Sequence, residues 1–327
     1  ARRADLVTMN WLAADIGGTY SRLAWHDDDR PAEPPLVVEN ARFTTFESVL
    51  DQALAHFDAA GQRIDSMTLA LPGPVHDEPV QLTNIDWRVS RRSLQERFAV
   101  KQLSIVNDFQ AAALGAILEP PEQLKTLNPG IPGSGPAVVA GAGTGLGMAW
   151  FARNDPDTVP HATEGGHVDF APQDAEQQRL HDSLAARFGH VSYERILSGS
   201  GLIDVYRHLA RSELPALTAA EVRAAAERGD EAGLAAVRLF VDVFAAYAGN
   251  LALSFNPAGG IYLCGGLAVH LADWFEPAGF QARFLAKGRM RQIVERIPVF
   301  LVTRHNTGLA GAMRLARQTT GQKDDQQ

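Results

Sequence analysis

The chain has 327 residues, about twice the usual domain size of roughly 150, so two domains are expected. Hydrophobic residues make up 46% and charged residues 21%, which is ordinary for a soluble globular protein. A net charge of −8 argues against a nucleic-acid surface, because a phosphate backbone is held by clustered lysine and arginine. The single cysteine, Cys264, excludes an intramolecular disulfide and a multi-cysteine zinc site, and it fits a reducing cytoplasm.

The ends of the chain and its apolar runs suggest neither secretion nor a membrane. No apolar segment follows the two arginines near the start, so no signal peptide is expected. No apolar run approaches the roughly 18 residues that a membrane span requires, so no membrane partner is expected. Residues 319–327 are polar and lack aromatics, which predicts a disordered tail.

The first third of the chain alternates between short strands and turns. Four apolar runs predict strands at residues 11–14, 22–25, 67–71 and 103–106. The last of these runs into Asn107 and Asp108, which are good helix N-cap residues, and a helix is expected at 110–118. Pro120 and Pro121 then interrupt the chain, which places a domain boundary near residue 120.

The second part of the chain opens in the same way as the first. Strands are expected at 137–140 and 148–151, on either side of a glycine-rich turn. Each opening ends in an Ala-Trp pair, at positions 24–25 and 149–150, which suggests an internal duplication. A long amphipathic helix at 234–255, a strand at 261–264 and a final helix at 308–318 follow. This alternation of strands and helices predicts an α/β fold.

Three glycine turns end predicted strands. Residues 15–19 read Asp-Ile-Gly-Gly-Thr, which is either a hairpin turn with a capping aspartate or a turn whose N–H groups hold phosphate oxygens. Residues 143–147 form neither a P-loop nor a clean dinucleotide loop, since a strand rather than a helix is expected after Gly147. Gly265-Gly266 alone is typical of close packing, but the three turns together suit a nucleoside triphosphate.

The polar residues near these turns suggest hydroxyl chemistry. Asp108 is placed either as a helix N-cap or as a general base for a sugar hydroxyl, or as both. Glu164 and His167 share a loop with two glycines, which disfavours a helical zinc site that includes His161 and favours polyhydroxyl recognition. Glu194 is expected near the start of a helix, where its carboxylate would interact favourably with the helix dipole, and this is the alternative to a role in binding hydroxyls. Cys264 is expected to be a buried strand residue.

Eight segments taken in order resemble the bacterial-type glucokinase family of the hexokinase and actin-like ATPase superfamily. They begin at Asp15 (DIGGT), Leu71 (LPGPV), Leu82 (LTNIDW), Val106 (VNDF), Gly143 (GTGLG), Glu164 (EGGHVDFAP), Gly189 (GHVSYERILSG) and Cys264 (CGG). They span roughly residues 10–315 and are far more specific together than singly.

The resemblance implies a fold and an activity. The fold would be two RNase H-like α/β domains around a central cleft: a small domain at 9–120, completed by a helix at about 305–318, and a large domain at 121–304. The activity would be ATP-dependent phosphorylation of glucose to glucose 6-phosphate in the cytoplasm, with ATP and Mg²⁺ required and with a homodimer as the expected assembly.

The resemblance also assigns roles to residues. Asp108 would be the general base for the C6 hydroxyl, and Asp15 would hold Mg²⁺ through water. The substrate-binding residues would be Asn107, Glu164, His167, Glu194 and Gly73. The residues facing the nucleotide would be Ala14, Asp15, Ile16, Gly17, Gly18, Thr19, Gly143, Thr144, Gly145, Gly265 and Gly266.

One position departs from the family pattern and leaves an alternative open. Tyr20 stands where the family usually has asparagine, so the geometry of the phosphate loop or the affinity for ATP is in question. A catalytically weak sugar-binding or regulatory protein is therefore a second hypothesis, and an NAD(P)-dependent oxidoreductase using residues 141–147 is a third. The hexose range, the preferred phosphoryl donor and the oligomeric state are not determined by these residues.

Overall fold

The computed structural model describes residues 9–28, 30, 32–73, 75–82, 85–152, 159–210 and 217–321. These residues form two compact units. Unit 1 contains the described residues up to Gly115 and those from Asn306 onward, and unit 2 contains Ala116–His305. The division falls inside helix α3 (Asp108–Ile117), slightly before the prolines at which the sequence suggested a boundary. Residues 322–327 of the expected tail lie outside the described residues, whereas 319–321 are helical.

Unit 1 is built on a five-stranded mixed sheet with the order β3-β2-β1-β4-β7. Its strands are β1 (Asn10–Ile16), β2 (Tyr20–Asp27), β3 (Leu36–Glu39), β4 (Ile64–Leu71) and β7 (Val100–Asn107). β1, β2 and β3 run antiparallel, whereas β1, β4 and β7 run parallel. The four strands predicted in this part are confirmed. β3 was missed because it is short and only one of its residues is buried.

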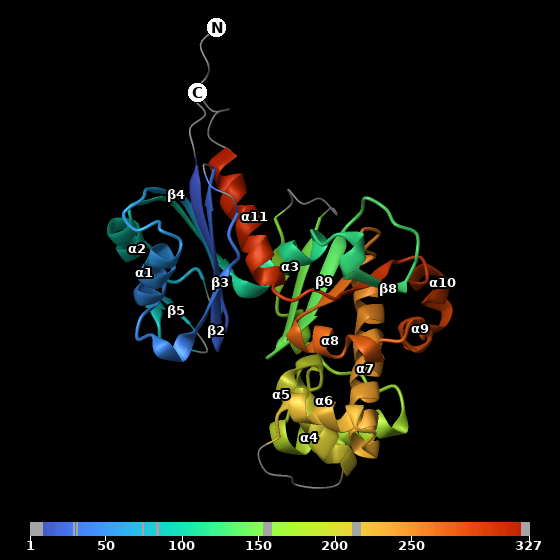
Figure 1. Ribbon diagram of the computed structural model, residues 1–327. Helices are drawn as coiled ribbons and strands as arrows, with labels where there is room; N and C mark the ends of the chain where they lie inside the picture. Colours follow the sequence, from blue (N-terminus) through green and yellow to red (C-terminus); the bar gives the residue numbers. More distant parts are fainter. Residues whose placement is uncertain are drawn as a thin grey trace. The chain divides into compact units, whose positions relative to one another are not determined.

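Helices cover both faces of this sheet (Figure 1). On one face α1 (Phe46–His56) and α2 (Arg91–Phe98) pack with the strands into the main core. On the other face α3 and α11 (Thr307–Gly321) pack against a patch of small residues and Trp11. The helix predicted near the end of the chain is thus confirmed, and it completes unit 1. A two-stranded hairpin, β5 (Val80–Gln81) with β6 (Arg88–Val89), lies outside the main sheet.

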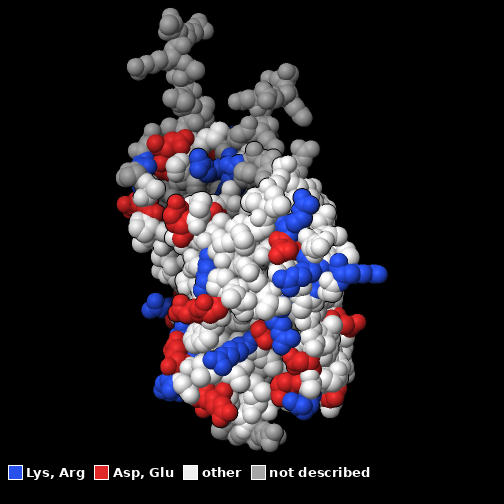
Figure 2. All heavy atoms as spheres, turned by 90° about the vertical axis from the view of Figure 1, so that its right-hand side faces the viewer, with Lys and Arg blue, Asp and Glu red and all other residues white. Residues whose placement is uncertain are grey.

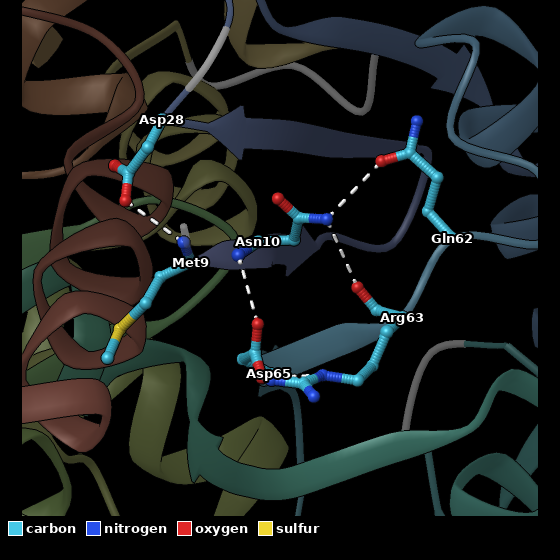
Figure 3. Close-up of polar contacts among 6 residues, drawn as sticks. All are labelled: Met9, Asn10, Asp28, Gln62, Arg63 and Asp65. Carbon is cyan, nitrogen blue, oxygen red and sulfur yellow. Dashed lines mark hydrogen bonds and ion pairs between the residues drawn. The ribbon is translucent and has the colours of Figure 1, made fainter. Parts of the chain in front are cut away.

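The start of β1 is held by polar contacts (Figure 3). The backbone N–H of Asn10 donates to Asp65 at 3.3 Å, and its side-chain amide donates to Gln62 and to the carbonyl of Arg63, both at 3.3 Å. The backbone N–H of Met9 donates to Asp28 at 3.0 Å and is the main cause of the lowered pKa of that carboxyl. These bonds are partly exposed, so they anchor the strand without being essential to the core.

Unit 2 repeats the sheet of unit 1. Its order is β11-β10-β9-β12-β13-β8. The strands are β8 (Leu124–Asn128), β9 (Ala137–Ala142), β10 (Leu146–Phe151), β11 (His161–Thr163), β12 (Gly260–Cys264) and β13 (Val299–Val302). As in unit 1, three neighbouring strands (β11, β10 and β9) run antiparallel and three (β9, β12 and β13) run parallel, so β9 belongs to both sets. β8 pairs antiparallel with β13 and forms an additional edge strand. This shared topology supports the predicted duplication and confirms the α/β class.

A long buried helix, α7 (Glu231–Phe255), organises the rest of unit 2. The α-helices around it are α4 (Ala175–Phe188), α5 (Gly199–Ala210), α6 (Ala219–Glu227), α8 (Gly266–His270), α9 (Pro277–Phe284) and α10 (Arg291–Val294). Short 3-10 turns occur at η1 (Asn40–Arg42), η2 (Pro121–Gln123), η3 (Gly165–His167), η4 (Tyr193–Arg195), η5 (Ala272–Trp274) and η6 (Gly288–Met290). In Figure 1, α4, α5 and α6 gather at one end of α7.

By length and composition α7 could cross a membrane, so the expectation that no segment is apolar enough was wrong for this helix. An 18-residue window has a mean hydropathy of 1.5, but 72% of it is buried inside the structure. Its apolar side chains contribute to the core of unit 2, which explains the composition without a membrane. The absence of a membrane partner stays a prediction.

Charged side chains of both signs are interspersed on the face shown in Figure 2. Many of the described charges are paired, for example Arg92 with Glu96 and Arg97 with Asp51. Exposed pairs of this kind contribute little to stability, on the order of 0–1 kcal/mol each.

The close contact between α3 and α11 generates a stability prediction. A Cβ atom on Gly311 would lie 1.9 Å from the carbonyl oxygen of Ala111, so alanine there must push the two helices apart. We expect Gly311→Ala to lower the free energy of unfolding by about 1–3 kcal/mol, measured by urea denaturation. The control is Gly279→Ala in α9, where a Cβ would meet nothing within 4 Å, and which should be neutral or stabilising by up to about 1 kcal/mol. Equal stabilities of the two variants would contradict the packing argument.

Candidate active site

The first glycine turn joins β1 to β2 and is fastened by an asparagine distant in sequence. The N–H of Gly17 donates to the carbonyl of Tyr20 at 3.0 Å, which closes the turn. The side-chain amide of Asn40 donates to the carbonyl of Gly17 at 2.8 Å, and its backbone N–H donates to the carbonyl of Thr19 at 2.9 Å. The hydroxyl of Ser21 donates to the side-chain oxygen of Asn40 at 2.7 Å. Gly18 and Thr19 remain exposed at the tip.

The turn forms with Tyr20 at the position that departs from the family pattern. Its backbone closes the turn while its side chain is 46% exposed. Asn40, buried and bonded on three sides, supplies the polar contacts that hold the turn. Sequence reasoning missed Asn40 because nothing local marks a residue that acts 23 positions away.

Asp15 lies near the end of β1 with little access to water. Burial is the main cause that raises the pKa of its carboxyl from 3.8 to about 6; Arg22 lowers this pKa and Asp108 raises it further. Arg22 lies 3.9 Å from the carboxylate, and a Cβ on Gly308 of α11 would be 2.8 Å from the carboxyl carbon. The side chains of Ala14 and Ile16 are fully buried, so only their backbones could meet a ligand.

Asn107 is the last residue of β7 and Asp108 follows it, at the same edge of the sheet as Asp15. Asp15 pairs with Ala70, which pairs with Val106, so the ends of the three parallel strands lie level. Open α/β sheets bind ligands at this carboxyl edge. Gly73, just beyond β4, has a φ of 107°, a conformation that a residue with a Cβ avoids.

The structure decides which of the two predicted capping residues caps helix α3. The helix begins at Asp108 rather than at Gln110, and the side-chain oxygen of Asn107 accepts the N–H groups of Phe109 at 3.0 Å and Gln110 at 3.3 Å. Asn107 is thus the N-cap. The carboxylate of Asp108 accepts from the N–H of Phe109 at 2.7 Å, and burial raises its pKa above the ordinary value.

In unit 2, three of the predicted polar side chains lie together. Nε2 of His167 lies 3.8 Å from a carboxylate oxygen of Glu164 and 3.7 Å from one of Glu194. Glu194 accepts the N–H of Leu146 at 2.9 Å, which ties it to the start of β10. The carboxylate of Glu164 is 93% exposed and therefore open to solvent and ligands.

The glycine turn between β9 and β10 lies beside Glu194. A Cβ on Gly145 would lie 2.5 Å from a carboxylate oxygen of Glu194, so a larger residue there would displace that carboxylate. The N–H of Gly143 donates to the carbonyl of Gly145 at 2.8 Å, and Thr144 is exposed at the tip. Because strand β10 and not a helix follows, the oxidoreductase hypothesis is wrong.

Gly265 follows β12 with a φ of 96°, and a Cβ there would lie 2.4 Å from the carbonyl oxygen of Ala142. Gly266 begins α8, and a Cβ there would meet nothing within 4 Å. Cys264 is buried in β12 as predicted, and burial raises the pKa of its thiol to about 12.

Within the described ranges, no group of three or more histidine, cysteine, aspartate or glutamate side chains is arranged to hold a metal ion. His161 instead stacks on Trp150, with 4.5 Å between ring centroids. A cation near Asp15 would accordingly have to take most of its ligands from water and phosphate, which is how Mg²⁺ is usually held beside a nucleotide.

A family model described as Glucokinase matches residues 12–319, nearly the whole chain. The chain belongs to the glucokinase family. A glucokinase from Chromohalobacter salexigens is 37% identical over 314 residues, covering 92% of this chain and 95% of that protein.

Solved structures share the fold. A glucokinase from an Antarctic psychrotroph superposes with a TM-score of 0.81 at 29% identity, over 94% of this chain and 99% of that one. A ROK family glucokinase from Streptomyces griseus, solved with glucose and AMPPNP, matches with a TM-score of 0.63 at 21% identity, over 94% and 99% of the two chains. The second likeness concerns the fold alone.

The fastening of the first turn can be tested at Asn40. Asn40→Ala would leave the buried hydroxyl of Ser21 and the partly buried carbonyl of Gly17 without these partners. We expect a loss of about 1–3 kcal/mol in the free energy of unfolding, measured by urea denaturation. Asn10→Ala, which removes the longer and more exposed bonds at the other end of β1, should cost about 1 kcal/mol or less. A larger loss of stability in Asn10→Ala than in Asn40→Ala would contradict a role for Asn40 in holding the turn.

The raised pKa of Asp15 predicts a pH dependence of stability. Between 3.8 and about 6 the folded protein holds the proton more tightly than the unfolded chain, so the free energy of unfolding falls as pH rises through this window. Asp15→Asn cannot ionise. Its stability relative to wild type should therefore rise by about 1–3 kcal/mol between about pH 4 and pH 7 without magnesium. Chemical denaturation at several pH values measures the free energy of unfolding of both proteins. If the difference between Asp15→Asn and wild type were the same at every pH in this range, the carboxylate of Asp15 would be well solvated.

Proposed function

We propose that this protein transfers the terminal phosphoryl group of ATP to the C6 hydroxyl of glucose, with Asp108 as the general base. The observation that carries the proposal is the desolvated carboxylate of Asp108, at the carboxyl edge of the parallel strands. Membership of the glucokinase family supports the same reaction.

The raised pKa of Asp108 suits proton transfer from a sugar hydroxyl. A base is more effective when its pKa lies closer to the operating pH, provided that it stays ionised there. The N–H of Phe109 donates to the carboxylate and holds it in one orientation. Asn107 caps the helix with its oxygen, so its amide N–H groups would be the part that meets a sugar oxygen.

We propose that Glu164, His167 and Glu194 bind further hydroxyls of the sugar. Carboxylates accept from hydroxyls, and a histidine close to two carboxylates can donate to a hydroxyl oxygen. Gly73 is proposed to let the backbone approach the sugar, since its φ admits only a residue without a Cβ.

The phosphates of ATP are proposed to meet the two exposed turn tips, at Gly17-Gly18-Thr19 and at Gly143-Thr144-Gly145, with Gly265-Gly266 near the adenosine. Backbone N–H groups at such tips bind phosphate oxygens without a side-chain charge. Asp15 fits Mg²⁺ because a cation would offset the cost of ionising its desolvated carboxyl. When bound, Mg²⁺ would neutralise charge on the phosphates.

We also propose a cytoplasmic location, a homodimeric assembly and ATP as the preferred phosphoryl donor. The location rests on the single buried cysteine. The homodimer and the choice of ATP rest on the family resemblance. The alternative of a weak sugar-binding protein rested on Tyr20, and membership of the glucokinase family gives it no support.

The general-base role is tested by Asp108→Asn. We expect kcat for glucose to fall by about 10²–10⁴-fold, because the proton acceptor is lost while the side-chain shape is retained. ADP release in a coupled assay measures kcat, and calorimetry should find glucose affinity close to wild type and thermal stability equal to or above wild type. Asp51→Asn, an exposed aspartate paired with Arg97, is the control and should leave kcat unchanged. Near-normal turnover in Asp108→Asn would rule out the assignment.

A further inference from the structure

A chain of buried and partly buried polar side chains in unit 2 ends at both loops that carry the proposed sugar ligands. Two of these side chains, Tyr247 and Asn250, lie three residues apart on α7 and therefore on the same face of that helix. The hydroxyl of Tyr247 donates to the carbonyl of Gly165 at 2.9 Å, in the segment between Glu164 and His167. Asn250 donates to the hydroxyl oxygen of Tyr193 at 2.7 Å, and Tyr193 directly precedes Glu194.

A lysine sets the direction of this chain of bonds. The ammonium of Lys287 donates to the side-chain oxygen of Asn250 at 2.6 Å and to the carbonyl of Ala246 at 3.0 Å. An ammonium can only donate, so the amide oxygen of Asn250 must face it and the amide NH₂ must face Tyr193. The two tyrosine rings contact each other, with 4.7 Å between centroids, and both are 1% exposed.

The packing around Lys287 leaves it little freedom. A Cβ on Gly249 would lie 2.4 Å from Cε of Lys287 and 2.6 Å from the carbonyl oxygen of Phe284, so α7 admits the lysine stem only because residue 249 is glycine. Burial lowers the pKa of the Lys287 ammonium. Such a partly desolvated ammonium is costly unless its bonds are made, so it holds its partners in place.

We propose that Tyr247, Asn250 and Lys287 are positioning residues for sugar binding, which fix the two loops carrying Glu164, His167 and Glu194 to the rigid helix α7. The inference rests on the proposed function of those three ligands. A site that binds sugar hydroxyls must hold its side chains in position to within a fraction of an ångström. Hydrogen bonds from a rigid helix to the loops that carry those side chains provide this precision. The backbone bond from the N–H of Tyr193 to the carbonyl of Val168 at 3.1 Å joins the two loops to each other.

Tyr247→Phe is the test, because it removes one hydroxyl and keeps the ring. We expect the Kd for glucose by calorimetry, and the KM for glucose, to rise on the order of tenfold, corresponding to one hydrogen bond. The KM for ATP should stay within about twofold. A merely structural role would lower the melting temperature without separating the two substrates. Tyr206→Phe is the matched control, since Tyr206 is a buried tyrosine of α5 bonded to Asp230, and its glucose constants should not change.

Lys287→Met is the second variant, in case Tyr247→Phe folds poorly. It keeps the stem but removes the donor that orients Asn250, so the Kd for glucose should rise while the KM for ATP does not. An unchanged Kd for glucose in the folded variants, or an equal rise in Tyr206→Phe, would overturn the inference. Wild-type protein that neither binds nor phosphorylates glucose would overturn the proposed function first. Normal wild-type activity with unaffected variants would overturn the positioning role alone.

Discussion

Two desolvated carboxylates at one edge of a sheet are the constraint on which the structure of unit 1 depends. Burial raises the pKa of both Asp15 and Asp108, and the charge of Asp108 adds to the shift at Asp15. A core without a ligand would gain stability by replacing them. Their presence at the ends of β1 and β7 marks the edge where a cation and a proton-bearing substrate would offset that cost.

The parallel strands make this arrangement possible. In a sheet where β1, β4 and β7 run in the same direction, residues far apart in the chain end at one level. Glycines then allow the backbone and the neighbouring helices to approach closely. Gly308 leaves room for the carboxylate of Asp15, and Gly311 lets α11 lie against α3. The same principle recurs in unit 2, where Gly145 leaves room for Glu194.

The two units share a topology but differ in how they hold their polar groups. In unit 1 the turn after β1 is fastened by the single buried amide of Asn40. In unit 2 the loops are fastened through α7, by tyrosine hydroxyls and an amide oriented by Lys287. The difference follows from the insertion of helices α4 to α7 between β11 and β12, which places a long rigid helix behind the loops.

The amino-acid sequence by itself determined the α/β class, the main strands and the family, and it suggested the duplication, because these depend on local apolar runs, glycine turns and motifs that keep their order. It named Asp108 but left open whether that residue caps a helix. Only the tertiary structure showed that Asn107 is the cap and that burial raises the pKa of Asp108, since both depend on side-chain direction and on neighbouring strands. Asn40, Tyr247 and Lys287 likewise emerged only from the fold, because their side-chain partners are 19 to 82 residues away in the chain.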